Sequence, residues 1–405
     1  MTCNTLLKTI RLREFLSYGP SAQEISLGKL NVLIGPNGSG KSNLIEGLSV
    51  LQATPRDLPR PIREGGGVAE WLWKGPQARG VAEIEVTTEC PMLAVPLRYR
   101  LSFAQSGQRF DLTDEAIENT TKSDPTENDV SFYYRYQQGR PVLNTRTRVE
   151  GAVSQGRNGF HRTLKKESVS SEQSIVSQKK DADLYPEITW LGEQFGAMKL
   201  YREWGFGRNT GIRKSQQVDQ PGDFLLEDGS NMGLILNDLL HRGMRKTIIE
   251  KLRHFYDGIE DVTTKVLGGT IQVFLHEEGM NQPIPATRLS DGTLRYLCFL
   301  CVLLHPDPPS LVCIEEPELG IHPDILPRIG EMLVGASEGT QLIVTTHSDV
   351  LVSAMSETPE SVIVCERGVT GTSLRRLEKD KLKSWLKDYS LGEIWRMGEI
   401  GGNRW

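Results

Sequence analysis

The sequence predicts an α/β protein with a mixed-sheet core, an antiparallel β subdomain and a helical insertion. Three observations predict this class. A phosphate-loop pattern lies between a short apolar run and a segment with helical spacing of apolar residues. Two later apolar runs, Ser310–Ile314 and Gln341–Thr346, lead into polar residues. Between these halves, Val81–Val86, Leu97–Phe103 and Val130–Tyr136 alternate apolar and polar residues, as antiparallel strands do.

Composition is that of an ordinary globular protein. The chain has 405 residues, 38% of them hydrophobic and 24% charged, with a net charge of −5. This balance gives no global electrostatic case for nucleic acid, so such a contact would need a local basic patch. The opening residues lack a signal-peptide pattern, and the longest apolar run, Tyr296–Leu304, is too short to cross a bilayer. We expect a cytoplasmic protein that does not act at a membrane.

Six scattered cysteines favour reduced thiols in a cytosol. Cys298 and Cys301 form a C-x-x-C pattern that could indicate metal or redox chemistry. No second pair completes a zinc site in the sequence, and i,i+3 spacing puts both on one helix face. We expect both to pack in the core.

The phosphate loop fits G-x-x-x-x-G-K-[ST] at every fixed position. Its residues, with the asparagine that follows, are Gly35, Pro36, Asn37, Gly38, Ser39, Gly40, Lys41, Ser42 and Asn43. Glycines leave the backbone free to wrap a phosphate with its N–H groups at a helix N-terminus. Lys41 can reach the β- and γ-phosphates, and the Ser42 hydroxyl can hold Mg²⁺. The sequence therefore predicts binding of a nucleoside triphosphate, ATP, with Mg²⁺.

Two carboxylates follow the apolar run at Ser310–Ile314, directly before Pro317. A carboxylate at a strand end can orient Mg²⁺, and the next can position or deprotonate an attacking water. We assign Glu315 to the metal and Glu316 to the catalytic base; a solvated turn is the plain alternative.

A histidine follows the next apolar run. His347 comes directly after Gln341–Thr346, and at the end of a parallel strand it would point into the ligand crevice, near the γ-phosphate or the water. Ser290 and Gly292 begin a helix and could form a second anion-binding nest, although alone they are only a good N-cap.

The order of these motifs resembles the ABC-type ATPase heads of the SMC, Rad50 and RecF superfamily. They read Gly-Pro-Asn-Gly-Ser-Gly-Lys-Ser, Leu-Ser-Asp-Gly-Thr, Ile-Glu-Glu-Pro-Glu and Thr-Thr-His-Ser in chain order. More closely, the chain resembles stand-alone predicted ATPases grouped with OLD and Septu-type defence ATPases. The resemblance covers about residues 1–105 and 260–370, and extends more weakly to the glycine-rich stretch Leu391–Trp405.

The resemblance implies an ATP-sandwich homodimer. Ser290 and Gly292 of one subunit would complete the γ-phosphate site of the other, and Glu318–His322 would cross the dimer interface. It also implies a glutamine that senses Mg²⁺, for which Gln178 and Gln173 are the candidates near the transition from sheet to helix. The sequence departs from the family in having Glu315 where Asp is usual.

The expected domains are an N-terminal ATPase lobe over 1–167, a helical lid over 168–258, a C-terminal ATPase lobe over 259–370 and a tail over 371–405. Within the first, Arg140–Lys166 is basic and rich in glycine and serine. A solvated loop is the plain interpretation, and contact with a DNA backbone is the alternative.

Three functions remain open from the sequence. One is a switch in a DNA-linked or antiviral defence complex, which controls a separate effector such as a nuclease or toxin. The second is a RecF-like DNA-binding ATPase of DNA repair or maintenance without an effector. The third is the nucleotide-binding subunit of a transporter, which the long stretch between Ser42 and Ser290 disfavours. We favour the first, an ATPase that hydrolyses ATP to ADP and phosphate.

Overall fold

A computed structural model of the chain describes residues 5–122, 130–137, 140–145, 153–154, 160–163 and 169–402. At its centre, among these residues, is a six-stranded sheet in the order β11-β16-β17-β3-β18-β19. The strands are β3 Leu30–Ile34, β11 Lys199–Tyr201, β16 Leu311–Glu315, β17 Gln341–Thr345, β18 Val362–Gly368 and β19 Gly371–Arg376. All neighbours are parallel except β18 and β19, which form a hairpin.

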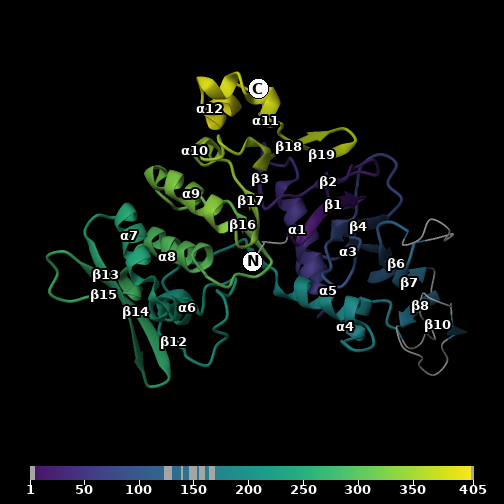
Figure 1. Ribbon diagram of the computed structural model, residues 1–405, viewed down its shortest axis with the longest axis horizontal. Helices are drawn as coiled ribbons and strands as arrows, with labels where there is room; N and C mark the ends of the chain where they lie inside the picture. Colours follow the sequence, from purple (N-terminus) through teal and green to yellow (C-terminus); the bar gives the residue numbers. More distant parts are fainter. Residues whose placement is uncertain are drawn as a thin grey trace.

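Both faces of the central sheet are covered, which explains why its strands are continuously apolar. Val32 and Ile34 on β3 belong to one buried cluster, with residues of α6, α8 and α9, whereas Leu33 belongs to the other, with residues of α1 and the antiparallel strands. Figure 1 shows α8 and α9 on one side of this sheet and α1 on the other. The helices are α1 Lys41–Ala53, α6 Met232–Leu239, α8 Asp291–Leu303 and α9 Leu326–Ala336.

The predicted antiparallel subdomain is a nine-stranded sheet among the described residues, ordered β2-β1-β4-β5-β6-β7-β8-β10-β9. Its strands are β1 Leu7–Arg13, β2 Ile25–Ser26, β4 Val81–Thr88, β5 Leu97–Ser106, β6 Arg109–Asn119, β7 Phe132–Gln137, β8 Arg140–Thr145, β9 Val153–Ser154 and β10 Phe160–Thr163. The described parts of the basic stretch are thus strands. Arg157, Lys165 and Lys166 lie outside the described residues.

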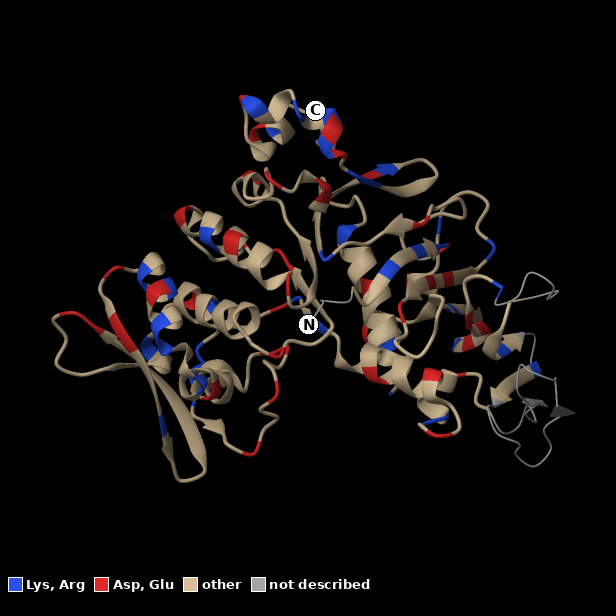
Figure 2. Ribbon diagram, viewed as in Figure 1, with Lys and Arg blue, Asp and Glu red and all other residues tan. Residues whose placement is uncertain are grey.

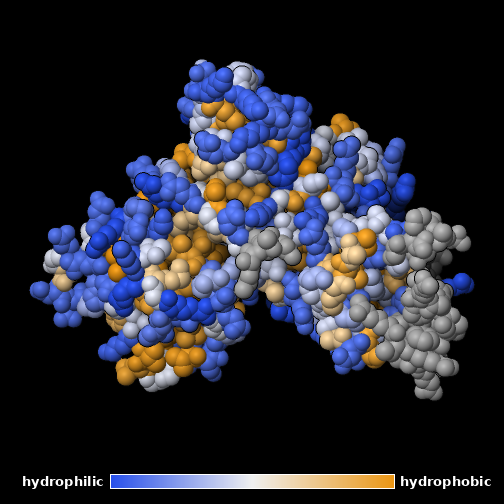
Figure 3. Space-filling view, viewed as in Figure 1, coloured by the Kyte–Doolittle hydropathy of each residue, from blue (hydrophilic) through white to orange (hydrophobic). Residues whose placement is uncertain are grey.

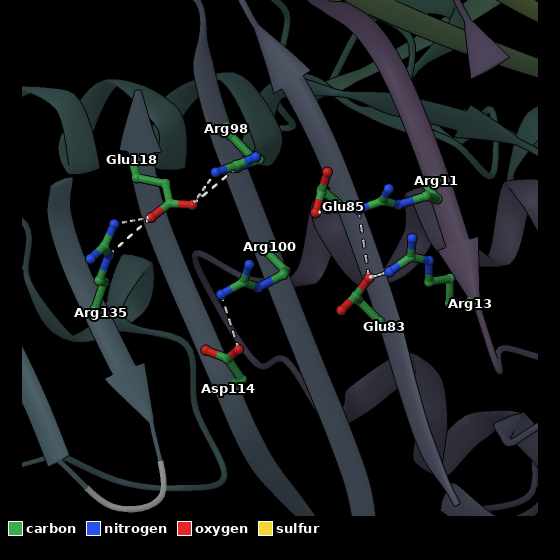
Figure 4. Close-up of polar contacts among 9 residues, drawn as sticks. All are labelled: Arg11, Arg13, Glu83, Glu85, Arg98, Arg100, Asp114, Glu118 and Arg135. Carbon is green, nitrogen blue, oxygen red and sulfur yellow. Dashed lines mark hydrogen bonds and ion pairs between the residues drawn. The ribbon is translucent and has the colours of Figure 1, made fainter. Parts of the chain in front are cut away.

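One face of this sheet carries rows of opposite charge (Figure 4). Glu118 on β6 accepts hydrogen bonds from Arg98 on β5 and Arg135 on β7, and its side chain is only 5% exposed. The remaining pairs are Arg11 with Glu83 and Glu85, Arg13 with Glu83, and Arg100 with Asp114. Because these five arginines already face carboxylates, this surface stabilises the sheet and is poorly suited to bind phosphate.

The segment expected to be a helical lid, residues 168–258, packs in part on α1 and in part on α8, which lie on opposite faces of the central sheet. Helices α4 Ile175–Gln178 and α5 Pro186–Ala197 pack together, and α5 also packs on α1. Helices α6 and α7 Arg245–Phe255, joined by the π-helix η4 Leu240–Met244, instead pack on α8. A small sheet completes this second lobe, with β12 Gln216–Gln217, β13 Ile259–Leu267, β14 Thr270–Glu277 and β15 Ile284–Pro285.

The surface mixes charges of both signs, and Figure 2 shows Lys and Arg interspersed with Asp and Glu over both lobes. Apolar side chains gather at the tip of the β13–β14 hairpin, where Val266 is 58% and Leu267 71% exposed (Figure 3, lower left). None of the described helices is long and apolar enough to cross a membrane.

The remaining helices are short. They are α2 Arg60–Glu64, α3 Val68–Trp71, α10 Asp349–Ser353, α11 Lys379–Leu382 and α12 Leu391–Arg396, with 3-10 helices η3 Gly211–Arg213, η5 Ala286–Arg288, η6 Pro323–Ile325, η7 Pro359–Ser361 and η8 Trp385–Lys387. In Figure 1, α11 and α12 lie above the central sheet. Cys298 and Cys301 are fully buried on α8 as expected, and no group of metal-ligating side chains occurs among the described residues.

Candidate ATPase site

The phosphate loop connects β3 to α1, as its sequence predicts. Gly35, Gly38 and Gly40 have φ values of 148°, 78° and 106°, in the region that favours glycine. A Cβ on Gly40 would also lie 2.3 Å from Oγ1 of Thr372, whose hydroxyl donates a hydrogen bond to the Ser39 carbonyl. Only glycine fits at this position, because both the backbone angle and the close neighbour exclude a side chain.

Lys41 lies across its own loop. Its Nζ donates hydrogen bonds to the carbonyls of Gly35, at 2.8 Å, and Pro36, at 3.2 Å. Burial lowers the pKa of the Lys41 amine, an effect that the nearby carboxylates of Glu316, Glu318 and Glu315 oppose. The amine therefore holds the loop in shape and lies within electrostatic reach of the acidic strand end.

The loop residues next to Lys41 differ in their surroundings. Ser42 is exposed, whereas the side chain of Asn43 donates a hydrogen bond to Ser17 at 2.7 Å. The buried Ser39 hydroxyl has no hydrogen-bond partner among the described residues. An unpaired buried hydroxyl within a glycine-rich loop fits a polar ligand such as phosphate.

The three strand ends converge because β16, β17 and β3 are adjacent and parallel. Glu315 is in register with Thr345, and Thr345 with Leu33, so the acids, the histidine and the phosphate loop follow the same edge of the sheet. Ligands bind at this edge in open α/β sheets. The carboxylate of Glu315 and the hydroxyl of Ser42 are oxygen donors of the kind that Mg²⁺ takes.

Glu316 has φ of 46°, unusual for a residue with a side chain, and its N–H donates to the Thr345 carbonyl at 3.0 Å. Its Oε1 lies 3.6 Å from Nε2 of His347. Burial and the Lys41 charge lower the pKa of His347, so its ring is neutral at neutral pH. Nε2 of a neutral imidazole, as donor or acceptor according to the tautomer, can hydrogen-bond a water molecule that also contacts the carboxylate.

Glu318 is a further carboxylate of the site. Its Oε1 accepts a hydrogen bond from the N–H of His347 at 2.6 Å, and burial raises the pKa of its carboxyl. Sequence reasoning placed Glu318 only in a stretch expected to cross a dimer interface. In this structure it fixes the backbone that carries the histidine.

Arg202 is the site residue that sequence reasoning missed. It follows β11, which is parallel to β16, and therefore lies at the same sheet edge. Its Nε is 3.2 Å from Oε2 of Glu315, and its Nη2 is 2.8 Å from Oε1 of Glu46 on α1. The one available signal was a short apolar strand followed by charge, which is too common to single out a residue.

Ser290 caps α8, and its Oγ accepts a hydrogen bond from the N–H of Thr293 at 3.0 Å. Arg213, which is buried, hydrogen-bonds the Leu289 carbonyl at 2.5 Å and forms an ion pair with Asp291. Ser290 is exposed, and its described side-chain hydrogen bonds stay within its own turn. The second lobe thus presents a rigid, solvent-facing serine nest, and the described polar contacts do not join it to the phosphate loop of the same chain.

The candidate glutamines have other partners. The side chain of Gln178 hydrogen-bonds the backbone of Ser170 and Gln173, at 2.9 and 2.8 Å. That of Gln173 hydrogen-bonds Leu58 and Asp57, at 3.1 and 3.0 Å. These contacts hold the turn before α4, so the structure does not bring either glutamine together with Glu315, whereas it does bring Arg202 there.

Comparison with known proteins agrees with this geometry. A family model described as "AAA domain, putative AbiEii toxin, Type IV TA system" matches residues 30–353. The chain belongs to this AAA domain family. It is also 28% identical over 193 residues to the Old nuclease of Escherichia phage P2, an alignment that spans 44% of this chain but only 32% of that protein.

Solved structures support the fold of the AAA domain protein. A Smc head domain with an extended coiled coil, bound to the C-terminal domain of ScpA from Pyrococcus furiosus, superposes with a TM-score of 0.57 at 12% identity, covering 95% of this chain and 99% of that one. A Smc head domain from Pyrococcus yayanosii gives 0.55 at 11% identity, with the same coverage. This likeness confirms the predicted fold, an α/β domain of the kind found in Smc heads.

Proposed function

We propose that this AAA domain protein binds and hydrolyses ATP with Mg²⁺ and uses the nucleotide to assemble a dimer that controls a separate effector. The observation that carries the proposal is the convergence of the phosphate loop, Glu315, Glu316 and His347 on one edge of the central sheet. Few other chemistries need a phosphate cradle, a metal-side acid and a second acid paired with histidine in one place.

Each residue has a role in this scheme. The N–H groups of the loop and the Lys41 amine would bind the phosphates, and Ser42 and Glu315 would hold Mg²⁺, which would neutralise charge on the transferred phosphoryl group. Glu316 accepts a proton from the attacking water, and His347 orients that water from the other side. Arg202 forms an ion pair with Glu315 and so competes with Mg²⁺ for this carboxylate.

The second lobe supplies the partner half of the site. Ser290 is exposed at the start of α8, and its loop is braced by Arg213. A serine nest on the γ-phosphate of another subunit would complete the site only in a dimer, which makes assembly depend on ATP.

We propose only the class of the effector, which is a nuclease or a toxin. Two points support it: the family is described as including a putative toxin of a toxin–antitoxin system, and the phage P2 relative is a nuclease. The aligned part covers about a third of that nuclease, so a nuclease activity belongs to that protein and is not proposed for this chain.

Lys41→Ala tests the nucleotide assignment. Removing the cation should weaken ATP binding and lower phosphate release at least about tenfold, because the lysine neutralises phosphate charge. Isothermal titration calorimetry with ATP and a phosphate-release assay measure the two effects. Lys383→Ala, which removes an exposed lysine from α11's flank, is the matched control. Equal turnover by the Lys41 and Lys383 variants, with circular dichroism unchanged, would contradict the proposal.

A further inference from the structure

The chain segment Ser390–Gly402, here called the bridging segment, touches two separate parts of the ATPase site. Its helix, α12, begins with a capping box in which Ser390 and Glu393 satisfy each other's backbone N–H groups. The segment then passes through left-handed glycines at Gly398, Gly401 and Gly402, with φ of 85°, 75° and 73°. Such turns let the chain leave the helix and fold back toward the sheet.

The first contact is with α10, the helix that begins two residues after His347. Nε of Arg396 lies 3.0 Å from Oδ2 of Asp349, and the Leu391 N–H donates to Oγ of Ser356, in the turn after α10, at 2.9 Å. A Cβ on Gly392 would lie 2.0 Å from the Asp349 carbonyl oxygen. The two helices are therefore in backbone contact, which fixes α12 relative to the residues that carry the histidine.

The second contact is with the start of the phosphate loop. The Gly402 N–H donates to Oε1 of Glu366 at 3.0 Å, and Nη2 of Arg375 donates to the Ile400 carbonyl at 2.7 Å. A Cβ on Gly402 would lie 3.0 Å from Cγ1 of Val364 and 3.5 Å from Cα of Gly35. Gly402 is thus packed directly against the first residue of the phosphate loop.

We propose that the bridging segment is a positioning element of the ATP site. It fixes the phosphate loop relative to α10, the helix that follows His347, and bound nucleotide stabilises it in turn. The phosphate loop, with its left-handed glycines Gly35, Gly38 and Gly40, has little intrinsic order. A neighbour that restricts this loop therefore reduces the entropy lost when a phosphate binds to it. The coupling is reciprocal, because a segment that favours the ATP-binding conformation must be favoured by ATP to the same degree. The inference rests on the proposed function, that this loop binds ATP.

A double variant, Glu366→Ala with Arg375→Ala, removes the two hydrogen bonds to the segment and leaves the phosphate loop unchanged, since both side chains are exposed positions of the β18–β19 hairpin. Losing two hydrogen bonds should weaken ATP binding about tenfold. The control is Glu378→Ala with Lys381→Ala, which removes an exposed ion pair of the same charges on α11 and its preceding residue. Both double variants should keep the wild-type unfolding midpoint to within about 2 °C.

A second pair of variants avoids removing charge. Gly402→Ala adds a methyl group against Val364 and Gly35, whereas Gly269→Ala has nearly the same φ, 77°, with no neighbour within 4 Å. The two positions have nearly the same backbone angle, so they differ in the neighbours that the methyl group meets, which at Gly402 are Val364, Trp395 and Gly35. ATP binding should weaken for Gly402→Ala alone.

Hydrogen exchange followed by mass spectrometry gives the readout that a purely structural role would not change. In the wild type, a non-hydrolysable ATP analogue should slow exchange of peptides covering 391–402, and the Glu366/Arg375 variant should lose this protection. The inference would be overturned if the Glu366/Arg375 variant and Gly402→Ala both bound ATP as tightly as the wild type. It would also be overturned if nucleotide did not change hydrogen exchange in residues 391–402 of the wild type. Failure of every form, wild type included, to bind ATP would instead contradict the proposed function, and the inference with it.

Discussion

Glu115→Gln should change how the stability of the protein depends on pH. Glu115 lies on β6 with 0% exposure, and its carboxylate accepts hydrogen bonds from Tyr99 at 2.8 Å, from the Ile175 N–H at 2.9 Å and from Ser174. Burial raises the pKa of Glu115 to about 7, although these hydrogen bonds oppose the shift. The carboxyl group joins the antiparallel sheet to the N-terminus of α4, so its protonation affects both.

The magnitude follows from the shift. The folded protein binds the Glu115 proton more tightly than the unfolded chain, in which the pKa of Glu115 is 4.5. The stabilisation from this proton is therefore fully present below pH 4.5 and is lost as the pH rises through about 7. At 1.36 kcal/mol per pKa unit, the wild type should lose about 2 to 3 kcal/mol of unfolding free energy between pH 5 and pH 8. Glutamine cannot titrate, and its amide can still accept from Ile175 and donate to the hydroxyls, so the variant lacks this loss.

Urea denaturation of both proteins at four values between pH 5 and pH 8 measures the difference, because other titrating groups cancel between them. Glu260→Gln, at an exposed position on β13, is the control and should follow the wild type. If Glu115→Gln and the wild type lose stability in parallel over this range, the carboxyl does not titrate near neutrality in the folded protein, and the reasoning from burial is refuted.

Two further predictions concern ligands. Arg202→Ala should lower severalfold the Mg²⁺ concentration that half-saturates ATP binding, because the guanidinium no longer competes with the metal for Glu315. Arg328→Ala, which removes an exposed arginine, is the control. An unchanged or higher Mg²⁺ concentration for Arg202→Ala would contradict the prediction. If the basic stretch 140–166 binds DNA, neutralising four of its residues should reduce the salt dependence of binding by up to about one unit of slope per lost contact, and equal binding at every salt concentration would leave only solvated surface. The four residues are Arg157, Arg162, Lys165 and Lys166.

The parts of the site that depend on local sequence could be predicted. The phosphate loop directly follows a short buried strand, and Glu315 and Glu316 lie at the end of another, so the chain cannot place them elsewhere than at those strand ends. Parallel pairing of the strands then brings Glu315, His347 and Lys41 to one edge. Apolar runs of five residues are enough to predict these buried parallel strands, because both faces of the sheet are covered.

The parts that depend on distant pairing could not be predicted. The polar and acidic composition of residues 113–129 predicts a hairpin tip, but residues 113–119 continue β6, because Asp114 and Glu118 form ion pairs with arginines on neighbouring strands. Arg202 reaches Glu315 only because a three-residue strand pairs with β16, over a hundred positions away in the chain. A cross-strand partner of this kind leaves no periodic signal in the sequence.

Dimer assembly is the measurement that tests the central claim most directly. Glu316→Gln should stop hydrolysis but keep the nucleotide contacts, so ATP persists and shifts the monomer–dimer equilibrium toward the dimer. Adding Ser290→Arg places a bulky cation in the exposed nest at the start of α8 and should reverse that shift while single-subunit ATP binding remains. Light scattering of the single and double variants, each with and without ATP, should show a larger species only for Glu316→Gln with ATP. ATP-dependent assembly that survives Ser290→Arg would contradict a shared ATP site.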